Sequence, residues 1–430
     1  MSTAAWKTAQ ALRATLPPLT LERLPNGLTV GLLPSRRTPV VATALVYGVG
    51  ARNEVKQELG AAHFLEHMMF KGSRQYPAGK IDHVTRSLGG SNNAYTSHDS
   101  TLYYFTFAAD RWQEALAIEA DRMAHLSLDP EEVGSERQVI LEELAMYESE
   151  PWDILEQKVA SALFPDHPYG RPILGTRESL AGLGAEELRD FHRRYYHPSN
   201  AVLALAGDLP DDVLDRVAEA FGDLEPGPLV EPRSPDVPTA HREMVRVERR
   251  QGEVPRMLLS MPAPAAGDPD HPLLLTLAAV LGTGRASRLH RALVDEGQLC
   301  AWATAELQET HEPGALVCAL EVVPGVEPQR AEAEVLRCLD ELRRHGPTED
   351  EVRRVHKVLQ ADWLFSHERV YQHAFLMGTS LSLFDAEHPW LYFERLLAAE
   401  AGRLQEVAQR YLRPESGVLG WSLPQKGATP

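Results

Sequence analysis

Short apolar runs alternate with amphipathic segments along the first half of the chain. Residues 21–33 hold two apolar stretches on either side of Asn26-Gly27, a pair typical of a tight hairpin turn. Residues 38–54 read TPVVATALVYGVGARNE and predict a buried strand that ends in a glycine-rich bend. Residues 100–109 predict another strand, and residues 110–126 and 131–149 predict helices. Strand pairs and hairpins between helices favour an α+β layered fold over a doubly wound parallel sheet.

The two halves of the chain share one of these patterns. The segment ELRDFHRRYYHPSNAVLALAGDL begins at Glu187, and RLQEVAQRYLRPESGVLGWSLP begins at Arg403. At a constant offset of 216 residues, Tyr195 pairs with Tyr411 and the prolines and apolar residues that follow also match. Each segment predicts an amphipathic helix, a break at proline and a short apolar strand. An offset of half the chain indicates a duplicated domain.

A proline-rich stretch separates the two repeats. Residues 226–240 contain five prolines, which neither continue a helix nor donate ladder hydrogen bonds. We therefore predict an N-terminal domain over residues 1–225, a linker over 226–240 and a homologous C-terminal domain over 241–430. A chain of 430 residues is long enough to build two cores, which fits two homologous domains, each a sheet covered by helices.

Composition and charge exclude some classes of function. The formal net charge is −18 and no basic patch emerges, which argues against a nucleic-acid-binding protein. Cys300, Cys318 and Cys338 lack metal-ligand spacing and predict buried thiols in a reducing compartment. Lys7 and Arg13 interrupt the region where an export signal would need an apolar run, and no stretch approaches the length of a membrane span. We therefore predict no membrane association and a cytoplasmic location, or a periplasmic one if an export signal has been removed.

The segment AAHFLEHMMFKGS, residues 61–73, carries the first chemical motif. In a helix, His63 and His67 lie one turn apart on one face, so both imidazoles can reach one metal ion. Glu66 then projects at the edge of that face, where a base for a metal-bound water would lie. A surface histidine pair beside a solvated glutamate explains the motif equally well, so a third ligand is needed.

Candidates for the third ligand occur in SERQVILEELAMYESEP, where Glu136 and Glu143 are seven residues apart. This spacing places them on one helix face, together with Val139 and Ile140. Carboxylates in line with core-facing residues need a partner, and a bound cation would supply one. A salt-bridged helix edge is the alternative, and the spacing alone favours it.

These motifs together resemble a known family. HFLEH at residues 63–67 is followed, 76 residues after its second histidine, by Glu143. This arrangement resembles the pitrilysin-type zinc peptidases, which carry an inverted H-x-x-E-H motif and include the mitochondrial processing peptidases and bacterial two-subunit homologues. GVGARNE, HMMFKGS and LGGSNNAYTSHDSTLYY are similar to the family pattern as well. With the duplicated halves, the resemblance covers nearly the whole chain.

The resemblance implies a zinc site and a role for each motif residue. His63, His67 and Glu143 become the zinc ligands, and Glu66 becomes the general base that activates the zinc-bound water. Glu136 becomes a carboxylate that supports the site without binding the metal, as partners of metal ligands commonly do.

The resemblance also implies a substrate-binding strand. Asn93, Ala94, Tyr95 and Thr96 match the strand whose edge receives an extended substrate peptide in the family. Such binding adds a strand to a sheet, so backbone hydrogen bonds hold any sequence and alternate side chains read specificity. From the residues alone, Asn92-Asn93 is better interpreted as a turn before a strand.

The second half departs from the pattern of family members that are complete in one chain. Those members carry an Arg and a Tyr, seven residues apart, which resemble an oxyanion hole. In the segment GTGRASRLHRALVDEGQLCAWATAEL, Asp295 stands where the arginine is expected and Trp302 where the tyrosine is expected. An aspartate repels an oxyanion, and a tryptophan donates only its ring N–H. The chain therefore resembles the metal-bearing subunit of a two-chain peptidase whose homologous partner supplies the Arg/Tyr pair.

The leading interpretation is a zinc metalloendopeptidase subunit that hydrolyses bonds in extended or unfolded peptides. It predicts a heterodimer with a homologous partner subunit, or a homodimer. A non-catalytic scaffold subunit of the same fold is the alternative, although a scaffold does not need His63, Glu66, His67 and Glu143 together. A module that binds peptides without cutting them is a third possibility.

Overall fold

The computed structural model describes residues 10, 13, 17–230 and 241–424. Residues 231–240 of the predicted linker lie outside the described residues. The linker and the domain boundaries at residues 225 and 241 therefore stay a prediction.

The first half of the chain forms a mixed sheet of six strands in the order β1-β2-β6-β3-β5-β4. Its strands are β1 (Thr20–Arg23), β2 (Thr29–Pro34), β3 (Val40–Tyr47), β4 (Ser91–Thr96), β5 (Thr101–Ala108) and β6 (Ala201–Gly207). Its longer helices are α2 (Ala61–Met68), α3 (Lys80–Ser87), α4 (Gln113–His125), α5 (Pro130–Tyr147), α6 (Pro151–Leu163), α7 (Arg177–Gly182), α8 (Ala185–Tyr195) and α9 (Val213–Phe221). Single helical turns are η1 (Ala51–Asn53), η2 (Lys56–Glu58), η3 (Pro168–Gly170) and η4 (Pro198–Asn200).

The second half forms a mixed sheet of five strands in the order β7-β11-β8-β10-β9. Its strands are β7 (Val245–Arg250), β8 (Arg256–Pro262), β9 (Cys300–Leu307), β10 (Ala315–Val322) and β11 (Val418–Leu423). Its helices are α10 (His271–Gly282), α11 (Arg288–His290), α12 (Pro328–His345), α13 (Glu349–Phe365), α14 (Val370–Leu383), α15 (His388–Leu397) and α16 (Ala401–Tyr411), with the π-helical turn η5 (Arg291–Glu296) and the short turn η6 (Pro414–Ser416).

The two sheets repeat one topology, which confirms the predicted duplication and the α+β class. In each sheet, the last strand along its half of the chain lies between two earlier strands, one parallel and one antiparallel to it. In the first sheet β6 lies between β2 and β3, and in the second β11 lies between β7 and β8. The predicted hairpin is present as β1 and β2, and the strands at residues 40–47 and 101–108 are β3 and β5. The predicted helices at residues 110–126 and 131–149 are α4 and α5, each slightly shorter than expected.

One face of each sheet packs against helices of its own half. In the first half, side chains such as Phe64 of α2, Phe105 of β5 and Phe191 of α8 share one buried cluster. In the second half, α10, α12, α13 and α16 bury apolar side chains against β8 and β10 in another cluster. The predicted burial of all three cysteines is confirmed, because each is a free, buried thiol of this second cluster.

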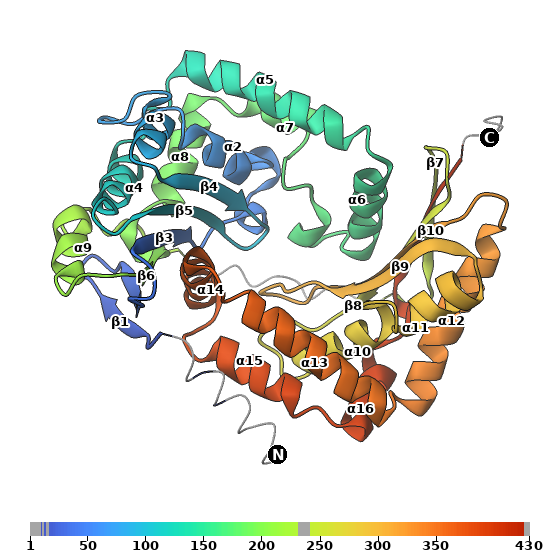
Figure 1. Cartoon of the computed structure of the whole chain (residues 1–430). Helices are drawn as coiled ribbons and strands as arrows, with labels where there is room; N and C mark the ends of the chain where they lie inside the picture. Colours follow the sequence, from blue (N-terminus) through green and yellow to red (C-terminus); the bar gives the residue numbers. More distant parts are fainter. Residues whose placement is uncertain (1–9, 11–12, 14–16, 231–240, 425–430) are drawn as a thin grey trace.

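The other face of each sheet receives a helix from the opposite half. Helix α14, from the second half, lies against β3 and β6 of the first sheet, and α6, from the first half, lies against β8 and β11 of the second sheet (Figure 1). The first contact joins Ala374 and Met377 to alanine and valine side chains of the sheet. The second joins Leu155 and Val159 to Leu258 and its neighbours. Each half therefore completes the core of the other.

Small residues allow these exchanged helices to approach closely. A Cβ on Gly378 of α14 would lie 3.0 Å from Cγ2 of Val46 and 3.4 Å from Cβ of Ala204. On the other side, a Cβ on Gly420 of β11 would lie 2.4 Å from Cγ2 of Val159. A larger side chain at either glycine would push helix and sheet apart.

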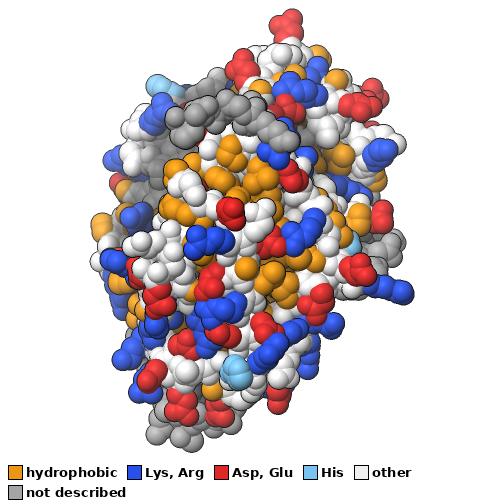
Figure 2. Space-filling model, turned by 90° about the vertical axis from the view of Figure 1, so that its right-hand side faces the viewer, with side chains coloured by type: hydrophobic (Ala, Val, Ile, Leu, Met, Phe, Trp, Pro, Cys, Tyr) orange, Lys and Arg blue, Asp and Glu red, His pale blue; other side chains and the backbone are white. Residues whose placement is uncertain are grey.

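The surface on the right-hand side of Figure 1 mixes apolar and charged areas. Apolar side chains gather around the middle of this face, and acidic and basic side chains lie among, above and below them (Figure 2). The net negative charge is therefore not collected into one acidic field on this face. None of the helices that the structure describes is long and apolar enough to cross a membrane.

We expect Gly378→Leu to destabilise the protein, because the new side chain enters the contact between α14 and the first sheet. Overpacking of this kind typically costs about 1–3 kcal/mol. The control is Gly402→Leu in α16, where a Cβ meets no heavy atom within 4 Å. Urea denaturation measures both variants. Equal midpoints for the two would contradict the close packing of α14.

Candidate metal centre

Helix α2 carries the three residues of the histidine motif, and its start is held by an acidic side chain. The helix begins after Gly60, which has a φ of 92° that favours glycine. The carboxylate of Glu54 accepts hydrogen bonds from the backbone N–H groups of Gly60 and Ala62, each 2.9 Å long. An acceptor at this end satisfies free helix donors and complements the helix dipole. The first turn of α2 is thereby anchored.

The motif residues lie along the edge of the apolar face of α2. Phe64 and Leu65 are fully buried, and His63 is 9% exposed. Glu66 and His67 are half-buried. The polar side chains therefore point away from the core of the first half but remain largely shielded from water.

One nitrogen from each histidine and one oxygen of Glu143 lie within 4.8 Å of one another. Glu143 Oε2 is 3.8 Å from His63 Nε2 and 3.7 Å from His67 Nε2, too far for hydrogen bonds. In a tetrahedral zinc site with bonds of about 2.0–2.1 Å, ligand atoms are roughly 3.3 Å apart. The donor types and their spacing therefore fit a zinc ion. No other group of three potential ligands is found in residues 10, 13, 17–230 and 241–424.

The protonation state of His63 also suits a metal ligand. Burial lowers the pKa of His63 to about 4, and the nearby His67 lowers it as well, so the ring is neutral at neutral pH. Neutral imidazole is the form that binds a metal. Nδ1 of His63 is buried without a hydrogen-bond partner among the described residues. A cation at Nε2 would bind the ring nitrogen that faces Glu143 and would leave Nδ1 to carry the ring proton.

The orientation of His67 is set by Glu136 and Lys71. Nδ1 of His67 lies 2.8 Å from Oε1 of Glu136, and Nζ of Lys71 lies 2.6 Å from Oε2. Burial raises the pKa of Glu136, but the hydrogen bonds from Lys71 and His67 outweigh it and lower the pKa overall. The ionised Glu136 accepts a hydrogen bond from Nδ1–H of His67, which leaves the lone pair of Nε2 facing Glu143. Sequence reasoning missed Lys71, although its place four residues after His67 was a usable signal.

Helix α5 presents Glu136 and Glu143 to α2 from positions two turns apart. Asp129 caps this helix, since its side chain accepts hydrogen bonds from the backbone N–H groups of the first turn. Ile140 is fully buried as predicted, but Val139 is 46% exposed. The prediction that Val139 faces the core is wrong, because the helix buries the face of Glu136 and Ile140 and turns Val139 towards solvent.

Glu66 is held by a residue from the edge strand of the sheet. Oγ1 of Thr96 donates a hydrogen bond to Oε2 of Glu66 at 2.5 Å. Burial raises the pKa of Glu66, while Thr96 and His67 partly oppose the rise. A carboxylate with a raised pKa holds a proton more readily than one in water. Sequence reasoning placed Thr96 only in the substrate strand, because nothing local links residue 96 to residue 66.

Residues 93–96 belong to β4, which lies at the end of the sheet. The interpretation of Asn92-Asn93 as a turn is wrong, because both lie in the strand opposite Phe105 and Tyr104 of β5. The side chains of Asn93 and Tyr95 are exposed, whereas Thr96 is buried. The free edge of β4 thus runs directly to the residue that contacts Glu66.

Two family profiles match the chain in succession. The profile of insulinase, peptidase family M16, matches residues 30–177, and that of the peptidase M16 inactive domain matches residues 182–359. An uncharacterised zinc protease of Streptomyces coelicolor is 31% identical over 421 residues, which cover 92% of this chain and 88% of the relative. This chain belongs to peptidase family M16.

Other relatives agree with this M16 assignment. The zinc protease PqqE of Helicobacter pylori is 27% identical over 91% of this chain and 89% of its own. Among solved structures, a protease from Helicobacter pylori superposes with a TM-score of 0.88 at 25% identity and covers 95% of this chain and all of that one. Pitrilysin shares the fold, with a TM-score of 0.77 at 22% identity, and this chain spans 45% of its length.

The second half of this M16 protein carries Asp295 and Trp302 in place of the Arg and Tyr of family members that are complete in one chain. Asp295 lies in η5, with Oδ1 3.8 Å from Nη2 of Arg285 and 3.6 Å from Nε2 of His290. Trp302 lies in the edge strand β9, where it is 37% exposed and its ring is 5.2 Å from that of Trp152. Trp302 therefore packs against the first half.

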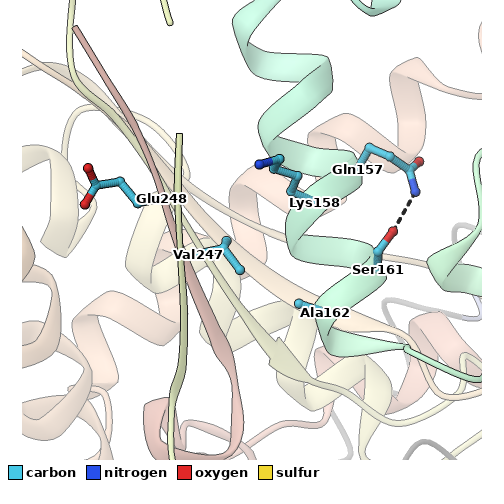
Figure 3. Close-up of a pocket in the computed structure, with 6 residues that line it drawn as sticks. All are labelled: Gln157, Lys158, Ser161, Ala162, Val247 and Glu248. Carbon is cyan, nitrogen blue, oxygen red and sulfur yellow. Dashed lines mark hydrogen bonds between the residues drawn. The ribbon is translucent and has the colours of Figure 1, made fainter. Parts of the chain in front are cut away.

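A separate groove lies between α6 and β7. Its walls hold Gln157, Lys158, Ser161, Ala162, Val247 and Glu248 (Figure 3). Lys158 extends from α6 towards β7, whereas Glu248 extends from β7 away from α6, and Gln157 donates a hydrogen bond to Ser161. None of these residues belongs to the metal group, so the groove is not part of the candidate centre.

We expect the purified protein to bind about one zinc ion, and His63→Ala to reduce its zinc content to background, because a catalytic zinc site needs three protein ligands. The control His83→Ala removes an exposed histidine of α3 and leaves the zinc content unchanged. Elemental analysis after dialysis measures both. Full zinc content in His63→Ala would contradict the ligand assignment.

Proposed function

We propose that this chain is the metal-bearing subunit of a zinc-dependent endopeptidase that hydrolyses peptide bonds in extended peptides. One observation carries the proposal: the donor atoms of His63, His67 and Glu143 lie close enough together to bind one metal ion. Glu66 directly precedes His67 on α2, so its carboxylate lies beside these donors. Membership of an insulinase-type peptidase family supports it.

The residues of the centre would divide the work of hydrolysis. His63, His67 and Glu143 would hold the zinc, which when bound acts as a Lewis acid that makes water more acidic and polarises a carbonyl. Glu66 would take a proton from the attacking water and deliver it to the departing amine. Thr96 holds the Glu66 carboxylate in one orientation through its hydrogen bond. Glu136 and Lys71 hold His67 in the tautomer that binds a metal.

Residues 93–96 would bind the substrate as an added strand. The outer edge of β4 has no neighbouring strand in the described part of the sheet. An extended peptide paired there is bound through its backbone, so many sequences are accepted. Because Thr96 at the end of β4 contacts Glu66, the paired peptide passes beside the proposed base.

The chain would share its chemistry with a homologous partner. Nucleophilic attack on a peptide carbonyl creates an oxyanion, which preorganised donors stabilise. In this chain Asp295 carries the wrong charge, and Trp302 is packed against Trp152. A homodimer presents the same residues to each centre. A heterodimer with a chain that bears an Arg/Tyr pair would supply the donors.

Replacement of the proposed base should separate zinc binding from catalysis. In Glu66→Gln, the amide keeps the shape but does not accept a proton, so we expect zinc to stay bound while the rate falls by about 10²–10⁴-fold. A fluorogenic peptide assay measures the rate. The control is Glu142→Gln, an exposed carboxylate on α5 next to Glu143. An undiminished rate in Glu66→Gln would exclude this residue as the base.

Addition of a partner should raise the rate of cleavage. We expect the isolated, zinc-loaded chain to be weakly active, and a homologue with the Arg/Tyr pair to raise the rate by about 10²–10³-fold, the typical contribution of one oxyanion donor. Co-purification and a peptide assay at equal zinc content test this. Full activity of the chain alone, unchanged by the partner, would contradict the shared site.

A further inference from the structure

Five polar side chains from the two halves meet at one buried junction. Arg52, Asp99, His167 and Tyr169 come from the first half, and Glu312 comes from the loop between β9 and β10 in the second half. We call this group the junction network. Asp99, His167 and Glu312 are each at least nine-tenths buried. None of the five is a residue of the candidate metal centre.

Glu312 is the contribution of the second half, and both of its oxygens are bonded to the first half. Oε1 accepts a hydrogen bond from Nη1 of Arg52 at 3.0 Å. Oε2 lies 2.8 Å from Nε2 of His167. Because Nδ1 of His167 accepts a hydrogen bond from the backbone of Tyr169, its Nε2 carries the proton and donates to Glu312. The buried carboxylate is thus matched by two donors across the junction.

Asp99 makes the reciprocal contacts from the first half. Its Oδ1 accepts a hydrogen bond from the Tyr169 hydroxyl at 2.7 Å and lies 3.3 Å from Nε of Arg52. Its Oδ2 accepts the backbone N–H of His311 at 3.0 Å. The Tyr169 hydroxyl in turn accepts the backbone N–H of Glu312 at 3.0 Å. Two backbone amides of the second half therefore depend on side chains of the first.

The junction network adjoins both segments that hold the proposed base. Asp99 lies in the turn that follows β4, three residues after Thr96, whose hydroxyl bonds to Glu66. Arg52 lies in η1, two residues before Glu54, which caps α2. The backbone N–H groups of Ala51 and Arg52 donate hydrogen bonds to carbonyls of residues 97 and 98, in the turn that holds Asp99, at 3.1 and 2.9 Å. A displacement of the β9–β10 loop would therefore act on α2 and on β4 together.

We propose that the junction network positions the metal centre: Asp99 and Glu312 tie the second half to the β4–β5 turn and thereby keep Thr96 against Glu66 and β4 in place. The inference rests on the proposed peptidase function for its kinetic consequence alone. Its structural consequence, a link between the junction and β4, holds for any function of the centre. Asp99 and Glu312 are positioning residues, since they act through Thr96.

Hydrogen–deuterium exchange in the full-length, zinc-loaded protein tests the link. In Glu312→Gln, we expect amide exchange in residues 310–312 and 97–100 to quicken by about tenfold or more, as the loss of a charged hydrogen bond would produce. Exchange in residues 91–96 of β4 should quicken as well. Tyr169→Phe removes only one hydroxyl, so exchange should quicken in the same residues but by a smaller factor. This second variant tests the link if Glu312→Gln folds poorly.

The matched control is Glu351→Gln. Glu351 also forms a shielded, two-pronged ion pair, with Arg288, but both residues belong to the second half. The control lowers stability without touching the junction network, so exchange in residues 91–100 should stay at the wild-type rate.

Peptide cleavage provides the second readout. In whichever assembly cleaves peptide, we expect Glu312→Gln to lower kcat by about tenfold or more at unchanged zinc content, because small displacements of catalytic groups are costly. Unchanged exchange in residues 91–100, or an equal change in Glu351→Gln, would overturn the inference. An unchanged kcat with loosened β4 would overturn its kinetic part. Wild-type protein that cleaves nothing, alone or with a homologue that bears the Arg/Tyr pair, would refute the proposed function, while the exchange experiment would still decide the structural link.

Discussion

The placement of α2 between the first sheet and α5 is the constraint on which the candidate centre depends. One face of this helix is apolar and buries Phe64 and Leu65, so its rotation about the helix axis is set by the hydrophobic core. Rotation in turn decides where His63, Glu66 and His67 point. With the helix held this way, Glu143 of α5 lies near both histidines, and Thr96 of β4 bonds to Glu66.

The two halves of the chain depend on each other through packing and through charge. The exchange of α6 and α14 places apolar side chains of each half in the core of the other, a contact that is not directional. The junction network adds directional hydrogen bonds between buried charged groups, which fix one relative orientation. Packing therefore holds the halves together, and the buried polar contacts define how they face each other.

Duplication has preserved topology without preserving chemistry. The strands β4 and β9 occupy the same edge of their sheets, yet a group of potential metal ligands is found only beside β4 within the described residues. The equivalent edge in the second half carries Trp302, whose ring packs against Trp152. A fold constrains where a site is built but not which residues build it, so the second half is free to serve as a wall and a partner surface.

Local patterns in the sequence predicted many of the helices and strands and the candidate donors of the metal centre. Helix periodicity places His63 beside His67 and Glu136 in line with Glu143, and alternating apolar runs mark β3 and β5, because these patterns are local. Val139 shows the limit of such patterns, since spacing puts it on the face of Ile140 and the structure exposes it. No local pattern predicts the contact of Thr96 with Glu66, the exchange of α6 and α14, or the contact of Asp99 with the loop of Glu312. These contacts join residues far apart along the chain, and their formation depends on how the sheets and helices pack in three dimensions.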